Sequence, residues 1–179
     1  MWHVDDLKVS HKSAKVVTCM EAWLHKTYER LFEDGSGGLK CSRGKVHEYL
    51  GMTLDFSEEF KVRITMFEYI AEIVDMFKKY DDTTRTAATP AADHIFQVRE
   101  DAPPLSEAMA TVFHHFVAKC LFATKRARPD IAMAVAFLTT RVQGPDEDDW
   151  KKLVRMIRYL RGTLLLPLTL SAESASIPK

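Results

Sequence analysis

Two adjacent carboxylates near the start of the chain, Asp5 and Asp6, are the residues whose types and spacing best suit chemistry. Val4 precedes them and Leu7 to Val9 follow, and these β-prone neighbours predict a hairpin with the two acids at its tip. Carboxylates exposed at a tip can hold Mg²⁺, with phosphate and water oxygens completing its octahedron. Two such ions would stabilise the attacking and leaving oxygens in phosphoryl transfer. An Asp pair is also common in ordinary turns, and that interpretation stays open.

Other catalytic patterns have little support in the sequence. The seven histidines do not form a ligand set: His114 and His115 are adjacent, so on a helix they point roughly 100° apart. No GxSxG signature places a nucleophilic serine. Three widely spaced cysteines without a CxxC motif favour reduced thiols, and they argue against a disulfide framework and a zinc knuckle.

Apolar spacing predicts the elements that position these residues, since periods of 3.6 and 2 indicate helices and half-buried strands. Strands precede most of the helices, which favours an α+β fold with segregated elements. The expected segments are a helix over 12–32, a hairpin of strands 46–56 and 60–66, a helix over 67–80, an extended connector over 81–104, and helices over 106–121, 129–142 and 145–162.

Charge is balanced overall, with 25 basic and 25 acidic residues, so no global field attracts nucleic acid or membrane. The last expected helix nevertheless has an apolar stripe and a basic side that carries Lys151, Arg155 and Arg158. Such a face can follow a phosphate backbone without reading sequence, and a solvated helix surface is the alternative. The apolar cluster near residues 164–170 is too short to span a bilayer.

Several stretches together resemble the reverse transcriptases of Ty1/copia-type LTR retrotransposons, and they occur in that family's order over about residues 2 to 163. The most specific are Ala-Arg-Pro-Asp-Ile-Ala at 127–132 and Arg-Tyr-Leu-Arg-Gly-Thr at 158–163. The matching stretches are His3-Val4-Asp5-Asp6, Glu48-Tyr49-Leu50-Gly51-Met52, Thr89-Pro90, residues 123–132 and residues 150–163. The family's box begins with tyrosine, where this chain has His3.

The resemblance implies a partial polymerase palm at residues 1–80, a connector at 81–104 and a three-helix thumb-like lobe at 105–163. It further implies a tail at 164–179 that leads toward a ribonuclease H domain absent from this chain. The implied catalytic and metal-binding residues are Asp5 and Asp6, which would hold two Mg²⁺ ions in the intact enzyme. Primer and nucleotide contacts would come from His3, Val4, Tyr49, Leu50 and Gly51.

A basic surface is expected on the helical lobe, because this segment resembles the thumb and connection region of the family. Its residues would be Lys125, Arg126, Arg128, Lys151, Arg155 and Arg158. If they line one groove, about four to six phosphate contacts would make affinity fall roughly as the inverse third to fifth power of salt concentration.

These expectations combine into one functional hypothesis, a fragment of an RNA-directed DNA polymerase that is inactive alone. The first metal-binding Asp and the fingers of the family are expected upstream of Asp5. Expected partners are an RNA/DNA primer-template, dNTPs and the missing polyprotein segments, within the cytoplasm or nucleus and away from membranes. The alternative is a non-catalytic nucleic-acid-binding remnant or an inert remnant of a retroelement polyprotein.

Overall fold

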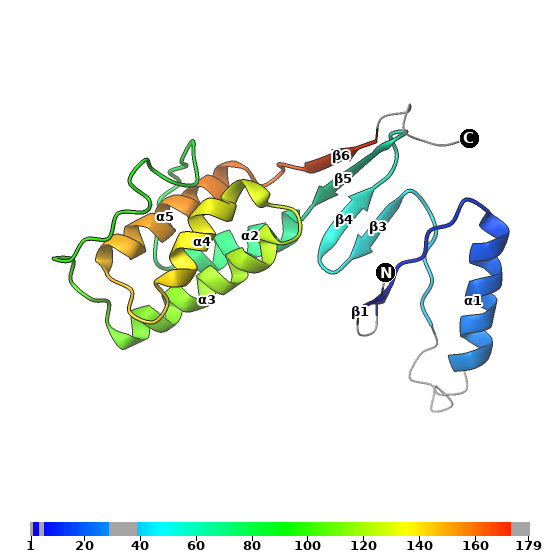
Figure 1. Cartoon of the computed structure of the whole chain (residues 1–179), viewed down its shortest axis with the longest axis horizontal. Coiled ribbons are helices and arrows are strands. Elements are labelled where there is room, and N and C mark those ends of the chain that lie inside the picture. The colour runs from blue at the N-terminus through cyan, green and yellow to red at the C-terminus, as the bar shows by residue number, and fades with distance from the viewer. Residues whose placement is uncertain (1, 4–5, 29–38, 173–179) are drawn as a thin grey trace.

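The structure is a computed structural model that describes residues 2–3, 6–28 and 39–172, and it has the expected α+β class. Figure 1 shows helices α2 to α5 gathered at one end, a sheet beside them, and α1 at the other end. None of the described helices is long and apolar enough to cross a membrane. The elements in chain order are β1 (Trp2–His3), β2 (Asp6–Leu7), α1 (Ala14–Tyr28), β3 (Val46–Tyr49), β4 (Met52–Asp55), β5 (Lys61–Thr65), α2 (Phe67–Phe77), α3 (Glu107–Thr124), the 3-10 helix η2 (Pro129–Ile131), α4 (Ala132–Thr140), α5 (Glu147–Gly162) and β6 (Leu168–Ser171).

The sheet is antiparallel in the order β3-β4-β5-β6, which confirms the predicted hairpin pairing. Met52 and Leu54 are buried and Ile64 is half-buried, so the period-2 pattern identifies the face that packs on the core. Strand β6 was not predicted: Leu168 pairs with Ile64, and the strand adds an edge to the sheet. Part of the expected C-terminal tail therefore belongs to the fold.

Side-chain caps begin two helices of the helical lobe. The Ser106 hydroxyl accepts a hydrogen bond from the Met109 amide at the start of α3. Asp146 and Asp149 form a reciprocal capping box at the start of α5, whose acids also suit the positive end of the helix dipole. Both helices therefore begin where side chains satisfy backbone amides that have no partner within the helix.

Helix α2 packs into the helical lobe, where it contacts α3 and α5. The ring of Phe77 lies 4.8 Å from that of Phe116 and 5.5 Å from that of Trp150, measured between centroids. Residues 67–77 thus share the core of the later helices. We expected a boundary at about residue 80 and three helices in the lobe. That expectation is wrong, because the apolar face of α2 is buried against the later helices, so the lobe has four α-helices among the described residues.

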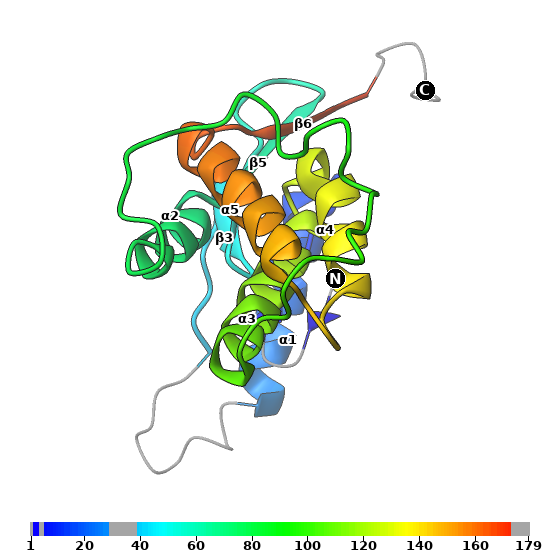
Figure 2. The same ribbon diagram turned by 90° about the vertical axis from the view of Figure 1, so that its left-hand side faces the viewer.

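Residues 81–104, which we call the strap, run over α5 as a long segment that contains several turns (Figure 2). The amide of Ala87 donates to the carbonyl of Arg158, and the Lys152 ammonium donates to the carbonyl of Gln97. The expectation of an extended connector holds only in part, because turns interrupt the segment. These bonds attach it along one helix of the lobe.

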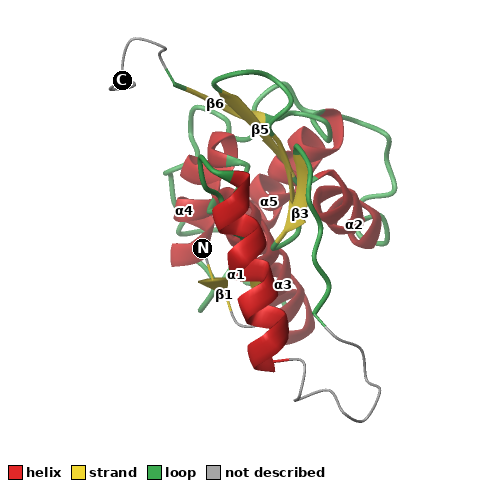
Figure 3. Cartoon of the chain, turned by 90° about the vertical axis from the view of Figure 1, so that its right-hand side faces the viewer, coloured by secondary structure: helices red, strands yellow, loops and turns green. Residues whose placement is uncertain are grey.

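Helix α1 confirms the predicted helix over residues 14–28, and residues 29–32 of that prediction lie outside the described residues. None of its residues is buried, and Trp23 is 55% exposed. Figure 3 shows α1 standing to one side of the sheet. The helical pattern of its apolar residues is therefore not matched by a core in the described part of this chain.

Candidate functional site

The predicted hairpin at the acidic pair is present: β1 and β2 are antiparallel, with Trp2 opposite Leu7 and His3 opposite Asp6. Val4, Asp5 and the side chains of His3 and Asp6 lie outside what the structure describes. Just after β2, the Lys8 ammonium lies 4.9 Å from the ring centroid of Phe56, the residue that follows β4. This cation–π contact places the segment after the acidic hairpin against the sheet.

The turn between β3 and β4 is formed by Leu50 and Gly51, with Tyr49 paired to Met52. Both central residues have positive φ, +52° at Leu50 and +72° at Gly51, as a type I′ turn requires. The expected single strand over 46–56 is therefore wrong, because Gly51 closes a two-residue loop that divides it into β3 and β4. Tyr49 is buried, Leu50 is half-buried and Gly51 is exposed, and the side chains of His3 and Val4 lie outside what the structure describes.

Arg158 is held by Asp81, although its side chain is still 28% exposed. Its Nε and Nη2 atoms each lie 2.9 Å from an Asp81 carboxylate oxygen, and Arg161 donates to the Asp81 carbonyl. Hydrogen bonds from Arg158 lower the pKa of the Asp81 carboxyl to about 2. A bidentate, charge-assisted pair of this kind fixes the start of the strap, so Arg158 is a structural cation.

Arg128, expected on the basic surface, is 1% exposed. Its guanidinium binds both carboxylate oxygens of Asp130 and donates to the carbonyl and hydroxyl oxygens of Thr163 at 3.1 and 2.7 Å. The expectation that Arg128 contacts nucleic acid is wrong, because its side chain is buried and these bonds occupy four of its five N–H donors. Arg128 instead joins the two most specific motif segments, residues 127–132 and 158–163.

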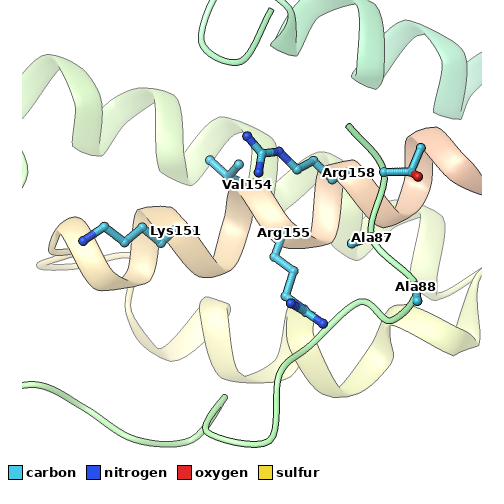
Figure 4. A pocket seen from close by; sticks show the side chains of 7 residues that line it. Ala87, Ala88, Lys151, Val154, Arg155 and Arg158 are labelled. Carbon is cyan, nitrogen blue, oxygen red and sulfur yellow. The ribbon is translucent and has the colours of Figure 1, made fainter. Parts of the chain in front are cut away.

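Lys151 and Arg155 remain as cations without a salt bridge in the part of the chain that the structure describes. They border a cavity of about 510 Å³ between α5 and the strap, which Thr86, Ala87 and Ala88 also line (Figure 4). Arg155 donates to the Thr89 hydroxyl at 2.9 Å, and its buried Nε has no hydrogen-bond partner. The lining contains no carboxylate, so this cavity suits an anionic group.

Lys125 and Arg126 lie at the other end of the lobe. Helices α3 and α5 begin side by side, since the Leu105 amide donates to the Pro145 carbonyl, while the C-terminal end of α5 adjoins Arg128. From Lys151 to Thr163 the helix rises about 18 Å. The expected single groove is therefore replaced by two separate clusters, and Arg126 additionally packs over the Phe122 ring at 3.4 Å.

Besides the acidic hairpin and the basic residues of the lobe, the structure brings together a group of possible metal ligands that the sequence analysis missed. Glu21 and His25 on α1 lie close to Cys41, with one ligand atom of each within 4.8 Å of the others. The i, i+4 spacing of Glu21 and His25 could have been read from the sequence. Cys41 follows a connector, so its approach to them depends on the tertiary structure.

Comparison with known proteins finds similarity to retrotransposon polyproteins. The chain is 24% identical over 166 residues to a retrovirus-related Pol polyprotein from transposon TNT 1-94 of Nicotiana tabacum. It is 25% identical over 161 residues to a putative transposon Ty5-1 protein of Saccharomyces cerevisiae. Each match covers 90% of this chain, but only 12% of the tobacco polyprotein and 48% of the yeast protein. No protein-family model matches, and no solved structure gives a significant match. These similarities support an origin of the chain in a retrotransposon polyprotein.

Proposed function

We propose that this chain is a fragment of a retrotransposon RNA-directed DNA polymerase. In the intact enzyme, Asp5 and Asp6 would bind two Mg²⁺ ions that stabilise the attacking and leaving oxygens of nucleotidyl transfer. The observation that carries this proposal is the similarity to a Pol polyprotein over 90% of the chain. Strands β1 and β2 pair as a hairpin with Asp6 in β2, and this hairpin is compatible with such a role.

Two further features support the proposal. The contact of Lys8 with Phe56 brings the segment after the acidic hairpin to the sheet that carries the Leu50-Gly51 turn. Phe56 follows the end of β4 that is remote from the turn, so this contact brings the acidic segment to the same sheet and not to the turn itself. Arg128 and Thr163 connect the two motif segments that most resemble the family, which gives their residue types a structural reason.

Primer extension tests the catalytic assignment, using this chain joined to the upstream polymerase segment of its element. The reaction would contain an RNA template, a DNA primer, dNTPs and Mg²⁺. Asp5→Asn and Asp6→Asn are each expected to reduce extension below detection, because each removes a charged metal ligand. Asp101→Asn is the matched control, since Asp101 is exposed and its ion pair is with the nearby Arg99. Extension at the parental rate by Asp5→Asn would contradict the proposal.

The second candidate is a non-catalytic nucleic-acid-binding module, and the cavity beside Lys151 and Arg155 favours it. Lys151 and Arg155 form no salt bridge with the described residues, and two such cations predict a shallow salt dependence, with affinity falling roughly as the inverse second power of salt concentration. The expected dissociation constant for an RNA/DNA hybrid is within ~10⁻⁴ to 10⁻⁶ M, the range of non-specific complexes. The inverse second power replaces the steeper salt dependence that we expected from six residues in one groove.

Fluorescence anisotropy of a labelled hybrid at several salt concentrations measures this binding. Replacing both Lys151 and Arg155 with alanine should weaken it and flatten the salt dependence. Arg99→Ala is the control, because it removes an exposed cation that Asp101 already neutralises. An affinity that does not change with salt concentration would contradict this candidate. So would a double variant that binds as tightly as the parent. Either result would make a solvated helix surface on an inert remnant the better description.

A further inference from the structure

Glu21, His25 and Cys41 form a compact set of three different ligand types outside the proposed polymerase site. Glu21 and His25 are separated by one helical turn, so their side chains share a face of α1. His25 Nε2 lies 3.7 Å from Cys41 Sγ, and one ligand atom of each residue is within 4.8 Å of the other two. In a tetrahedral zinc site, Zn–N and Zn–S bonds of about 2.0 and 2.3 Å hold nitrogen and sulfur roughly 3.5 Å apart. The observed spacing is close to that value.

We propose that Glu21, His25 and Cys41 bind a zinc ion, with a water molecule as the fourth ligand. A thiolate and an imidazole favour Zn²⁺ over Mg²⁺ or Ca²⁺, which take oxygen ligands. On binding, the Cys41 S–H bond breaks, an S–Zn bond forms and the proton passes to solvent. Neutral His25 supplies a nitrogen lone pair, and Glu21 supplies a carboxylate oxygen. Cys41 is exposed and the other two residues are half-buried, so solvent reaches the set.

Arg43 is the cation that competes with the metal. Its guanidinium forms an ion pair with Glu21 and donates to the Thr18 hydroxyl at 3.1 Å. Both Arg43 and the Glu21 side chain remain partly exposed, at 50% and 28%, so water can replace this pair when the metal binds. Removing the Arg43 charge should therefore tighten metal binding.

A metal at this position would connect α1 to the rest of the fold. The helix buries no residue of its own, and Cys41 lies in the segment that leads into β3. The ion would close the 16-residue separation between His25 and Cys41. A metal that joins two residues distant in the sequence restricts the conformations open to the chain between them. Zinc is therefore expected to order α1 against this segment.

Cobalt provides a direct probe, because Co²⁺ bound to a thiolate gives an intense near-ultraviolet charge-transfer absorption. The reduced full chain would be titrated with Co²⁺ and then with Zn²⁺, which should displace it. Cys41→Ser should abolish the charge-transfer band and weaken zinc affinity at least about tenfold, and His25→Gln should weaken affinity by a similar factor. Cys19→Ser is the matched control, since Cys19 is an exposed thiol on the same helix but outside the set.

Amide hydrogen exchange gives a second readout that does not depend on the cobalt spectrum. Zinc should slow exchange across residues 14–28 in the parent chain and leave it unchanged in Cys41→Ser, whereas Arg43→Ala should need less zinc for the same protection. The absence of a thiolate band in the parent would overturn the site. So would a band that disappears with Cys19→Ser, or zinc affinity in Cys41→Ser within twofold of the parent.

Discussion

Helices α5 and α1 have almost the same length, 16 and 15 residues, yet they differ completely in burial. Six residues of α5 are buried, including Leu153, Ile157 and Leu160, whereas α1 has none. Both segments carry apolar residues at helical spacing. The comparison shows that periodicity identifies the face that a helix can bury, while burial itself depends on which elements lie opposite that face.

The neighbours of the two helices explain the difference. Helix α5 packs against α2, α3 and α4, and the strap hydrogen-bonds along it. The described contacts of α1 with later residues are polar: Arg43 binds Glu21 and Thr18, and Cys41 meets His25. The helical lobe should therefore contribute most of the stability. Substitutions there should lower the free energy of unfolding far more than substitutions in α1.

The largest effect is expected from Phe77→Ala in α2. Phe77 is completely buried and its ring meets those of Tyr80, Phe116 and Trp150. Truncating a buried phenylalanine removes apolar contact and leaves a cavity, at a cost of about 3 to 5 kcal/mol in the free energy of unfolding. Urea denaturation followed by circular dichroism measures this loss. A change below about 1 kcal/mol would mean that α2 is not part of the helical core.

The next effect concerns Asp81, which attaches the strap to α5. The pKa of its carboxyl falls from 3.8 to about 2 in the folded chain, chiefly through hydrogen bonds from Arg158. A lowered pKa stabilises the fold fully above the unfolded value, and this contribution is lost as pH falls from about 4 toward 2. Asp81→Asn should therefore cost about 2 to 3 kcal/mol at pH 7 and much less near pH 2.

Urea unfolding at both pH values tests the role of Asp81, with Asp101→Asn as the control acid. Asp101 is exposed and its partner Arg99 precedes it by two residues in the strap. A cost for Asp81→Asn that stays constant between pH 7 and pH 2 would exclude the ion pair as its origin.

A smaller effect is expected in the sheet, at the turn of the β3-β4 hairpin. Gly51 has φ of +72°, and a side chain there is strained even though a Cβ would meet no atom within 4 Å. Gly51→Ala should therefore cost about 1 kcal/mol through backbone conformation. Gly144→Ala is the control, since that position has equal space without a positive φ. Equal thermal unfolding of the two variants would argue against the type I′ turn.

The smallest effect is expected from Trp23→Ala on α1. Trp23 is 55% exposed and its ring meets Tyr28 edge-on at 6.3 Å, within the same helix. The change in the free energy of unfolding should stay within about 0.5 kcal/mol, as for surface substitutions. Trp150→Ala is the contrasting variant, because that ring stacks on Phe77 in the lobe. A loss above about 1 kcal/mol for Trp23→Ala would show that α1 has a packing partner.

Much of the local structure was determined by the sequence itself. The caps at Ser106 and Asp146, the end of α5 at Gly162 and the alternation of Met52 with Leu54 all act within a few residues. Such signals require only a side chain and the nearby backbone, or a repeating period along one element. For the same reason the β1-β2 hairpin at the acidic pair was predictable.

The tertiary structure alone decided which charged residues are available for function. Arg128 and Arg158 look equivalent to Lys151 in the sequence, but acids and oxygen acceptors elsewhere in the chain bind them. Likewise, only folding brings Cys41 to His25. Long-range pairing of this kind depends on how packed elements align in space, and periodicity along one element carries no information about the partner that will lie across from it.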